Sequence, residues 1–121
     1  GHDKAPCYVT WSAENRSQLI RIPAAAGEYR RAELRSADPT ANPYIAYALL
    51  IYAGMYGLEH DLQLCPASDF NVYAAPAEVL SGLKKLPGSL YEAAALAGAS
   101  AFISKHLPET VISAYRHRCE A

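Results

Sequence analysis

The stretch from Pro43 to Leu58 contains no charged residue, and tyrosine hydroxyls are its only polar side-chain groups. It is shorter than the about 20 apolar residues that a membrane-spanning helix needs, and the tyrosines interrupt it. A helix that is apolar on every side belongs inside a globular fold. Because Asn42 can cap a helix and Pro43 suits its first turn, we expect a helix over residues 43–64 in the middle of the structure.

The segments on either side of this helix have different patterns. Before it, short alternating runs separated by turns predict antiparallel strands at about residues 7–12, 18–23 and 31–36. After it, capping and breaking signals predict helices at about residues 77–84, 89–105 and 108–119. Ser89 and Glu92 have the spacing of a capping box. Strands followed by helices indicate an α+β fold class.

The composition is that of one soluble globular domain, with 121 residues of which 51% are hydrophobic and 19% charged. The net charge of -1 provides no general attraction to nucleic acid or to an anionic membrane, and we expect neither as a partner. The cysteines, Cys7, Cys65 and Cys119, are far apart and form no Cys-x-x-Cys pair. We therefore expect reduced and mostly buried thiols in a cytoplasmic protein.

Five of the seven arginines lie in a short stretch where only Glu28 and Glu33 oppose them. They are Arg16, Arg21, Arg30, Arg31 and Arg35. On a strand, alternation places Arg31, Glu33 and Arg35 on one face. Guanidinium groups suit phosphate and carboxylate oxygens, and a carboxylate among them stays ionised and can bind a metal. The pattern predicts an open site for a polyanion, such as phosphate with a divalent cation.

Two other interpretations of the arginines remain open. The face could be a salt-bridged sheet surface that only contacts solvent. Binding of single-stranded nucleic acid is disfavoured, because such sites interleave aromatic and basic residues and only Tyr29 is aromatic in this stretch.

A series of short motifs runs along the chain. They are Asn15-Arg16-Ser17, Arg21-Ile22-Pro23, Arg31-Ala32-Glu33-Leu34-Arg35, Asp38-Pro39-Thr40-Ala41-Asn42-Pro43-Tyr44, Asn71-Val72-Tyr73 and Leu86-Pro87-Gly88-Ser89-Leu90-Tyr91-Glu92-Ala93. In this order and spacing they closely resemble the catalytic core of the glutamine synthetase family. The resemblance covers essentially the whole chain. It implies that residues 1–121 are a single segment, the C-terminal portion of a catalytic domain that is truncated on its N-terminal side and at its C-terminus.

The resemblance implies ATP-dependent ligation of ammonia to L-glutamate through γ-glutamyl phosphate. The implied partners are glutamate, ammonia and ATP, and the implied metal is Mg²⁺ or Mn²⁺. Glu33 would bind the metal, and Arg35 would hold glutamate. Arg16 would contact both glutamate and the phosphoryl group, whereas Arg21 and Arg31 would neutralise ATP phosphates.

The sequence departs from the family pattern near its N-terminus. Where the family has a flap glutamate close to the ammonium site, this chain has Lys4, with Asp3 beside it as a possible catalytic substitute. Where some members have an ATP-binding lysine, this chain has Glu28 or Tyr29. The changed flap keeps open an alternative within the family, a γ-glutamylamide synthetase that uses a polyamine or another amine.

The resemblance also implies an assembly. Family members form two stacked rings of identical subunits, with active sites between neighbours, so we expect this chain to be inactive alone. A non-catalytic assembly module is the remaining alternative. Tyr73 matches a tyrosine that some bacterial members adenylylate, although a structural role is the simpler interpretation.

Overall fold

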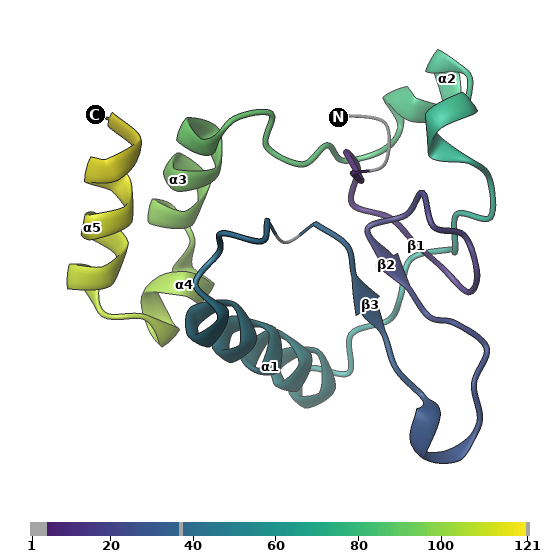
Figure 1. Cartoon of the computed structure of the whole chain (residues 1–121), viewed down its shortest axis with the longest axis horizontal. Coiled ribbons are helices and arrows are strands. Elements are labelled where there is room, and N and C mark those ends of the chain that lie inside the picture. Colours follow the sequence, from purple (N-terminus) through teal and green to yellow (C-terminus); the bar gives the residue numbers. More distant parts are fainter. Residues whose placement is uncertain (1–4, 37, 121) are drawn as a thin grey trace. The chain divides into compact units, whose positions relative to one another are not determined.

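The computed structural model describes residues 5–36 and 38–120, except for the side chains of residues 119 and 120. Its elements are β1 (Trp11–Ser12), β2 (Ile20–Arg21), η1 (Gly27–Tyr29), β3 (Glu33–Leu34), α1 (Pro43–Glu59), η2 (Val72–Ala74), α2 (Ala77–Ser81), α3 (Leu90–Gly98), α4 (Ala101–His106) and α5 (Glu109–Glu120). Strands come first and helices dominate afterwards, which confirms the α+β class (Figure 1). The chain divides into two compact units, Gly1–Pro39 with Leu64–Leu86, and Thr40–Gln63 with Pro87–Ala121.

A three-stranded sheet in the order β1-β2-β3 forms the centre of unit 1. β2 and β3 are antiparallel as expected, with Arg21 opposite Glu33. The expectation of an antiparallel β1–β2 pair is wrong, because these strands are parallel, with Ser12 opposite Arg21. Each strand is only two residues long, within the wider ranges expected at 7–12, 18–23 and 31–36.

The parallel pairing follows from the connection between β1 and β2, which is a loop rather than a hairpin turn. The Asn15 amide donates to Ser12 Oγ at 3.0 Å, and the Ser17 amide donates to Asn15 Oδ1 at 2.9 Å. These side-chain contacts turn the backbone in the way that Asn and Ser commonly do in loops. The chain therefore enters β2 in the direction in which it left β1.

The beginning of the expected strand at 7–12 pairs with a distant segment. Tyr8 forms an antiparallel bridge with Lys85, and the Val9 amide donates to the Lys84 carbonyl at 2.8 Å. Helix α2 accordingly ends at Ser81, earlier than the expected boundary at 84, because the following residues are extended for this pairing. Cys7 and Cys65 are free and exposed, so the expectation of mostly buried thiols is wrong for these two.

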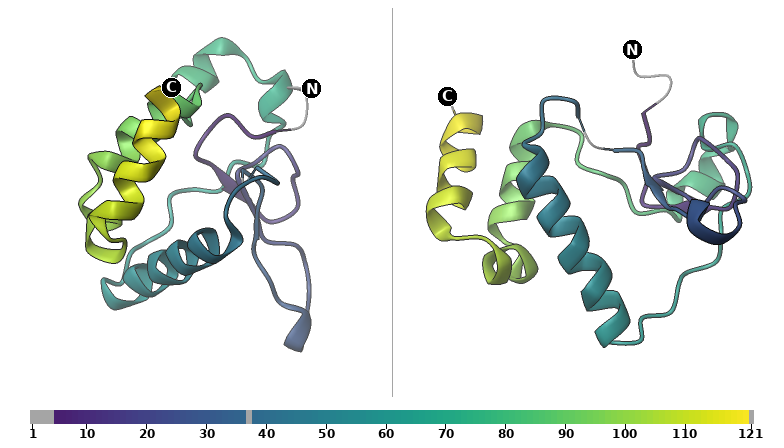
Figure 2. Two further views of the ribbon diagram at one scale, coloured as in Figure 1. Left: turned by 60° about the vertical axis from the view of Figure 1, so that its left-hand side comes forward. Right: turned by 60° about the horizontal axis from the view of Figure 1, so that its bottom comes forward.

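Unit 2 consists of helices. α3 packs along α5, and both views of Figure 2 show these helices side by side. α4 contacts both α1 and α3. Its contact with α1 is aromatic. The rings of Tyr52 and His106 stack with their centroids 4.0 Å apart, and the rings of Phe102 and Tyr56 meet edge to face with their centroids 6.1 Å apart. Among the described residues of this unit, Ile112 of α5 is the apolar residue that is buried, at 5% exposure.

Helix α1 begins as expected and differs from expectation in its end and its burial. Asn42 Oδ1 accepts hydrogen bonds from the Tyr44 and Ile45 amides at 3.0 and 3.3 Å, so the predicted cap is confirmed. The helix ends at Glu59, short of residue 64, because Asp61 has a positive φ of 47° that breaks the helix.

The expectation that α1 lies buried is wrong for this structure, since none of its residues is buried. A stripe of exposed apolar residues runs along it, formed by Tyr44, Tyr47, Ile51, Met55 and Leu58. Within the described residues, α4 covers only part of the helix surface. No helix among the described residues is long and apolar enough to cross a membrane.

The helix expected at 89–105 is divided into α3 and α4. Ser89 Oγ accepts from the Glu92 amide at 3.1 Å, which confirms the predicted cap of α3. The division follows Gly98, a poor helix former, and Ser100 caps a new helix by accepting from the Ile103 amide at 3.3 Å. The last helix, expected at 108–119, is present as α5.

Candidate functional site

Glu33 lies between two arginines in unit 1. The antiparallel register places Arg21 opposite Glu33, and Arg21 Nη1 donates to Glu33 Oε2 at 2.9 Å. Arg31 Nη2 lies 3.1 Å from Glu33 Oε1. Alternation predicted Arg31, Glu33 and Arg35 on one face. The structure pairs Arg31 with Glu33 and adds Arg21 from the neighbouring strand, whereas Arg35 lines a separate hollow.

Arg21 is the most enclosed member of this cluster, with its side chain 12% exposed. Besides Glu33, it donates from Nε to the Glu14 main-chain carbonyl at 2.9 Å. Its Nη2 lies 3.6 Å from Glu14 Oε2. Glu14 was not among the expected site residues, because nothing local in the sequence relates it to a residue on the next strand.

The arginines hold Glu33 in its charged form. The hydrogen bond from Arg21 is the main cause that lowers the pKa of Glu33, and the charges of Arg21 and Arg31 act in the same direction. Partial removal of the carboxylate from water opposes this effect and does not overcome it. Glu33 is thus an ionised carboxylate whose two oxygens both accept hydrogen bonds from guanidinium groups.

Two other predicted site residues, Arg16 and Arg35, line an open hollow of about 600 Å³ in the same unit. The remaining lining residues are Asn15, Ser17, Asn71 and Tyr73. Arg16 is exposed. Nη1 of Arg35 is buried and has no hydrogen-bond partner in the described part of the chain. A buried guanidinium donor without a partner is costly, and an anionic group in the hollow would satisfy it.

The structure thus divides the predicted residues into two groups. Arg21, Arg31 and Glu33 form the ion-paired cluster, and Arg16 and Arg35 face the hollow. Asp3, the expected catalytic acid, lies outside the described residues.

The residues that sequence reasoning missed are polar and belong to the hollow. The sequence motifs include Asn15, Ser17 and Asn71, but the sequence predicted no binding role for them. It predicted none for Gln18 either. Their residue type could have indicated a role in shaping the loop, because Asn and Ser side chains commonly form hydrogen bonds with nearby main-chain groups in loops. That signal does not reveal bonds to a distant segment.

The part of the chain that the structure describes does not supply a complete set of donors for a divalent metal. Among the described residues, no three His, Cys, Asp or Glu side chains gather into a metal-binding group. Both oxygens of Glu33 already accept from arginines. The residues present therefore do not fit a metal site by themselves.

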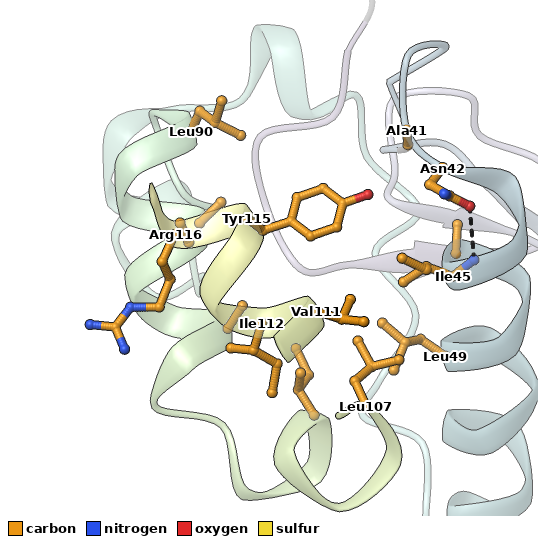
Figure 3. Close-up of a pocket in the computed structure, with 15 residues that line it drawn as sticks. Ala41, Asn42, Ile45, Leu49, Leu90, Leu107, Val111, Ile112, Tyr115 and Arg116 are labelled. Atoms are coloured by element: carbon orange, nitrogen blue, oxygen red, sulfur yellow. Dashed lines mark hydrogen bonds between the residues drawn. The ribbon is translucent and has the colours of Figure 1, made fainter. Parts of the chain in front are cut away.

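Unit 2 contains a second hollow, of about 270 Å³, with a different chemistry. Figure 3 shows it enclosed by aliphatic side chains such as Leu49, Leu107 and Val111, with the Tyr115 ring extending toward Asn42. The guanidinium of Arg116 points away from it. A lining of this kind suits apolar side chains and offers no group for binding an anion.

Comparisons with known proteins identify the family of this chain. Residues 1–120 match the family described as "Glutamine synthetase, catalytic domain". Glutamine synthetase of Methanosarcina mazei is 40% identical over 114 residues, which are 93% of this chain and 26% of that protein. Glutamine synthetase of Staphylococcus epidermidis is 42% identical over 92 residues, 74% of this chain and 21% of that protein.

A solved structure described as "GmaS/ADP complex-Conformation 1" has the same fold. It matches with a TM-score of 0.82 and 27% identity, over 99% of this chain and 26% of the solved chain. The fold and the site define an α+β segment with an arginine-rich cluster and an arginine-lined hollow. The chain belongs to the glutamine synthetase family and corresponds to part of its catalytic domain. It spans about a quarter of the length of the curated relatives that it matches.

Proposed function

We propose that this chain is the C-terminal portion of a glutamine synthetase catalytic domain. In the full-length protein it would supply the arginine and glutamate residues of a site that joins ammonia to L-glutamate with ATP. The observation that carries the proposal is the hollow of unit 1, which Arg16 and Arg35 line together, with Nη1 of Arg35 lacking a hydrogen-bond partner among the described residues. Because the chain spans only about a quarter of its relatives, we propose that it is inactive by itself.

In this proposal Arg35 and Arg16 bind the anionic substrates. Arg35 would hold a carboxylate of glutamate, since its buried Nη1 has no other acceptor in the described residues. Arg16, which is exposed at the same hollow, would contact glutamate and the phosphoryl group that becomes γ-glutamyl phosphate. Fixed guanidinium donors stabilise the negative charge that develops in acyl phosphate formation and in its displacement by an amine.

The ion-paired cluster would serve the phosphates of ATP. Arg21 and Arg31 are the proposed phosphate-binding residues. The matching GmaS structure is described as an ADP complex, which supports a nucleotide as a ligand of the full-length protein. Glu33 is proposed as one ligand of Mg²⁺ or Mn²⁺, because it is an ionised carboxylate. The other ligands would come from residues outside this chain, as would the neighbouring subunit in a two-ring assembly.

The acceptor amine is the part of the proposal with a specific alternative. The curated relatives are named glutamine synthetase, whereas the matching solved structure has another name, GmaS. The flap residues Asp3 and Lys4 also depart from the family pattern. A γ-glutamylamide synthetase that uses an organic amine is therefore the second candidate, and it would use the same arginines.

The test is phosphate release by the full-length protein with glutamate and Mg-ATP, comparing ammonium with a panel of amines. Turnover with ammonium supports glutamine synthesis, and turnover only with an organic amine supports the alternative. Arg35→Gln should raise the KM for glutamate by about tenfold or more, the value of one charge-assisted hydrogen bond. The matched control is Arg118→Gln at an exposed position of α5. If no amine supports turnover, both candidates fail and a non-catalytic module remains.

A further inference from the structure

A buried set of polar side chains connects two distant segments of unit 1. Ser17 Oγ accepts from the Val72 amide at 3.0 Å and donates to Asn15 Oδ1 at 2.9 Å. Asn15 Nδ2 and Gln18 Nε2 both donate to the Phe70 carbonyl, at 2.9 and 2.8 Å. The segment at residues 70–72 is thus held to the loop at residues 15–18 through its main chain.

Two of these side chains, Ser17 and Gln18, are buried, although polar residues are normally exposed. Gln18 is 0% exposed and Ser17 is 4% exposed. The Oε1 atom of Gln18 is buried and accepts no hydrogen bond in the described part of the chain. An amide whose acceptor is left unsatisfied stays in a core only where its donor is needed. The bond to the Phe70 carbonyl is the contact that uses this donor at full strength.

The bonded residues lie in or directly beside the walls of the hollow, because Asn15 and Ser17 line it themselves. Arg16 lies between Asn15 and Ser17, and Asn71 and Tyr73 flank Val72. Asn71 Oδ1 also accepts from the Tyr73 amide at 3.0 Å, which fixes the turn at that point. The same bonds therefore hold both walls of the hollow.

Arg35 is attached to this network as well. Its main-chain amide donates to the Leu19 carbonyl, next to Gln18, at 2.9 Å. A displacement of the loop at residues 15–19 would move Arg16 and Arg35 together, relative to Asn71 and Tyr73. Binding that depends on several fixed donors is sensitive to shifts of this kind.

We infer that Gln18 and Ser17 are positioning residues for the anion site. In this inference, which rests on the proposed function, both act through the main chain that they hold: Gln18 is not among the residues that line the hollow, and Ser17, which lines it, is assigned no contact with the substrate. They hold residues 70–72 against the arginine-bearing loop and so fix the width of the hollow in which Arg16 and Arg35 bind the anionic substrate.

The test uses two variants of the full-length protein, each with a matched control. Gln18→Met removes the amide and keeps the side-chain length, and Gln63→Met makes the same change at an exposed residue of unit 2. Ser17→Ala removes the hydroxyl, and Ser81→Ala does so at an exposed residue of α2. Should Gln18→Met fail to fold, Ser17→Ala decides the question alone.

Kinetics separate positioning from general structure. Each variant should raise the KM for glutamate about tenfold, the loss expected for one misplaced hydrogen-bonding group, while the KM for the amine stays within about twofold. Exchange of the amide hydrogens of residues 70–74 should become about tenfold faster. A merely structural role would lower the folded fraction and therefore kcat, with both KM values unchanged. That result, or an unchanged exchange rate, would overturn the inference.

A second readout keeps the inference testable if the wild-type protein turns over no glutamate. In that case the proposed function fails, and inorganic phosphate becomes the probe of the hollow, measured by calorimetry. Phosphate binding that weakens about tenfold in Gln18→Met but not in Gln63→Met would support positioning, because Gln18 is not among the residues that line the hollow. Equal binding by the two variants, or no binding by the wild type, would overturn it.

Discussion

The two units of this chain are stabilised in different ways. In unit 1, polar residues are as enclosed as apolar ones: Ser12 and Gln18 are 0% exposed, whereas Leu19 and Val72 retain 8% and 4%. In unit 2, the described helices touch through apolar and aromatic side chains, and the apolar stripe of α1 remains exposed. One unit is organised by directional hydrogen bonds and the other by non-directional apolar contact.

The difference explains where the candidate chemistry lies. Hydrogen bonds and ion pairs fix the direction of a side chain, which a binding site for a charged substrate requires. Apolar contact stabilises in proportion to buried area and tolerates small shifts. The arginine site accordingly lies in unit 1, and unit 2 offers surfaces and an apolar hollow.

The largest expected effect is at the ion-paired carboxylate. Glu33→Gln in the full-length protein removes the charge that pairs with Arg21 and Arg31, and phosphate release should fall by about 100-fold or more, as for other charge-stabilising groups. Glu78→Gln at an exposed residue of α2 in the same unit should leave the rate unchanged. Undiminished activity of Glu33→Gln would contradict the placement of the catalytic site in unit 1.

The next effect concerns the stability of unit 2. Ile112→Ala should lower the free energy of unfolding by about 2–4 kcal/mol, since it deletes buried methyl groups and leaves a cavity. The measurement is urea unfolding, together with hydrogen exchange of α3 and α5. The comparison variant is Val79→Ala, at a residue 42% exposed, for which a much smaller loss is expected. Equal losses of unfolding free energy in the two variants would contradict the conclusion that buried apolar contact stabilises unit 2.

A pH dependence should appear in unit 1. Glu33 has a folded-state pKa below its ordinary value of 4.5, with Arg21 as the main cause. Its contribution to stability is therefore complete above that value and is lost as the pH falls through the lowered folded-state pKa. Hydrogen exchange of β2 and β3 should accelerate on acidification, and Arg21→Met should flatten this dependence. A steep dependence that persists in Arg21→Met would contradict the assignment.

The smallest expected effect is at a helix cap. Ser89→Ala should cost about 1 kcal/mol, because Ser89 Oγ accepts from the Glu92 amide at the start of α3. Ser104→Ala, at an exposed position inside α4, should change stability by less than about 0.5 kcal/mol. Circular dichroism during thermal unfolding would measure both. Equal effects would show that the cap contributes nothing specific.

Local features of the fold were predictable from the sequence. The caps at Asn42 and Ser89 were predicted because a cap joins a side chain to a main-chain amide two or three residues away. A strand within residues 31–36, observed as β3 at Glu33–Leu34, and the ionised state of Glu33 were predictable from residue type and alternation.

Long-range features were not predictable in the same way. The parallel pairing of β1 with β2 and the bridge between Tyr8 and Lys85 depend on loop paths that no local pattern encodes. The apolar composition of α1 shows that the helix has surface to bury and does not say what covers it. The burial of Gln18 was missed for the same reason, because its partner lies at Phe70.

The Phe70 carbonyl accepts hydrogen bonds from two side-chain amides, and this arrangement limits which substitutions the chain can tolerate during evolution. Asn15 and Gln18 both donate to a main-chain oxygen of residue 70 and not to its side chain. A mutation at residue 70 that keeps an apolar side chain therefore preserves both hydrogen bonds. At residue 72, proline is excluded because its nitrogen carries no hydrogen for Ser17. We therefore expect sequence variation to differ between the two sides of this contact. Residues 15, 17 and 18 should retain their hydrogen-bonding side chains, whereas the side chains of the segment that they hold can vary.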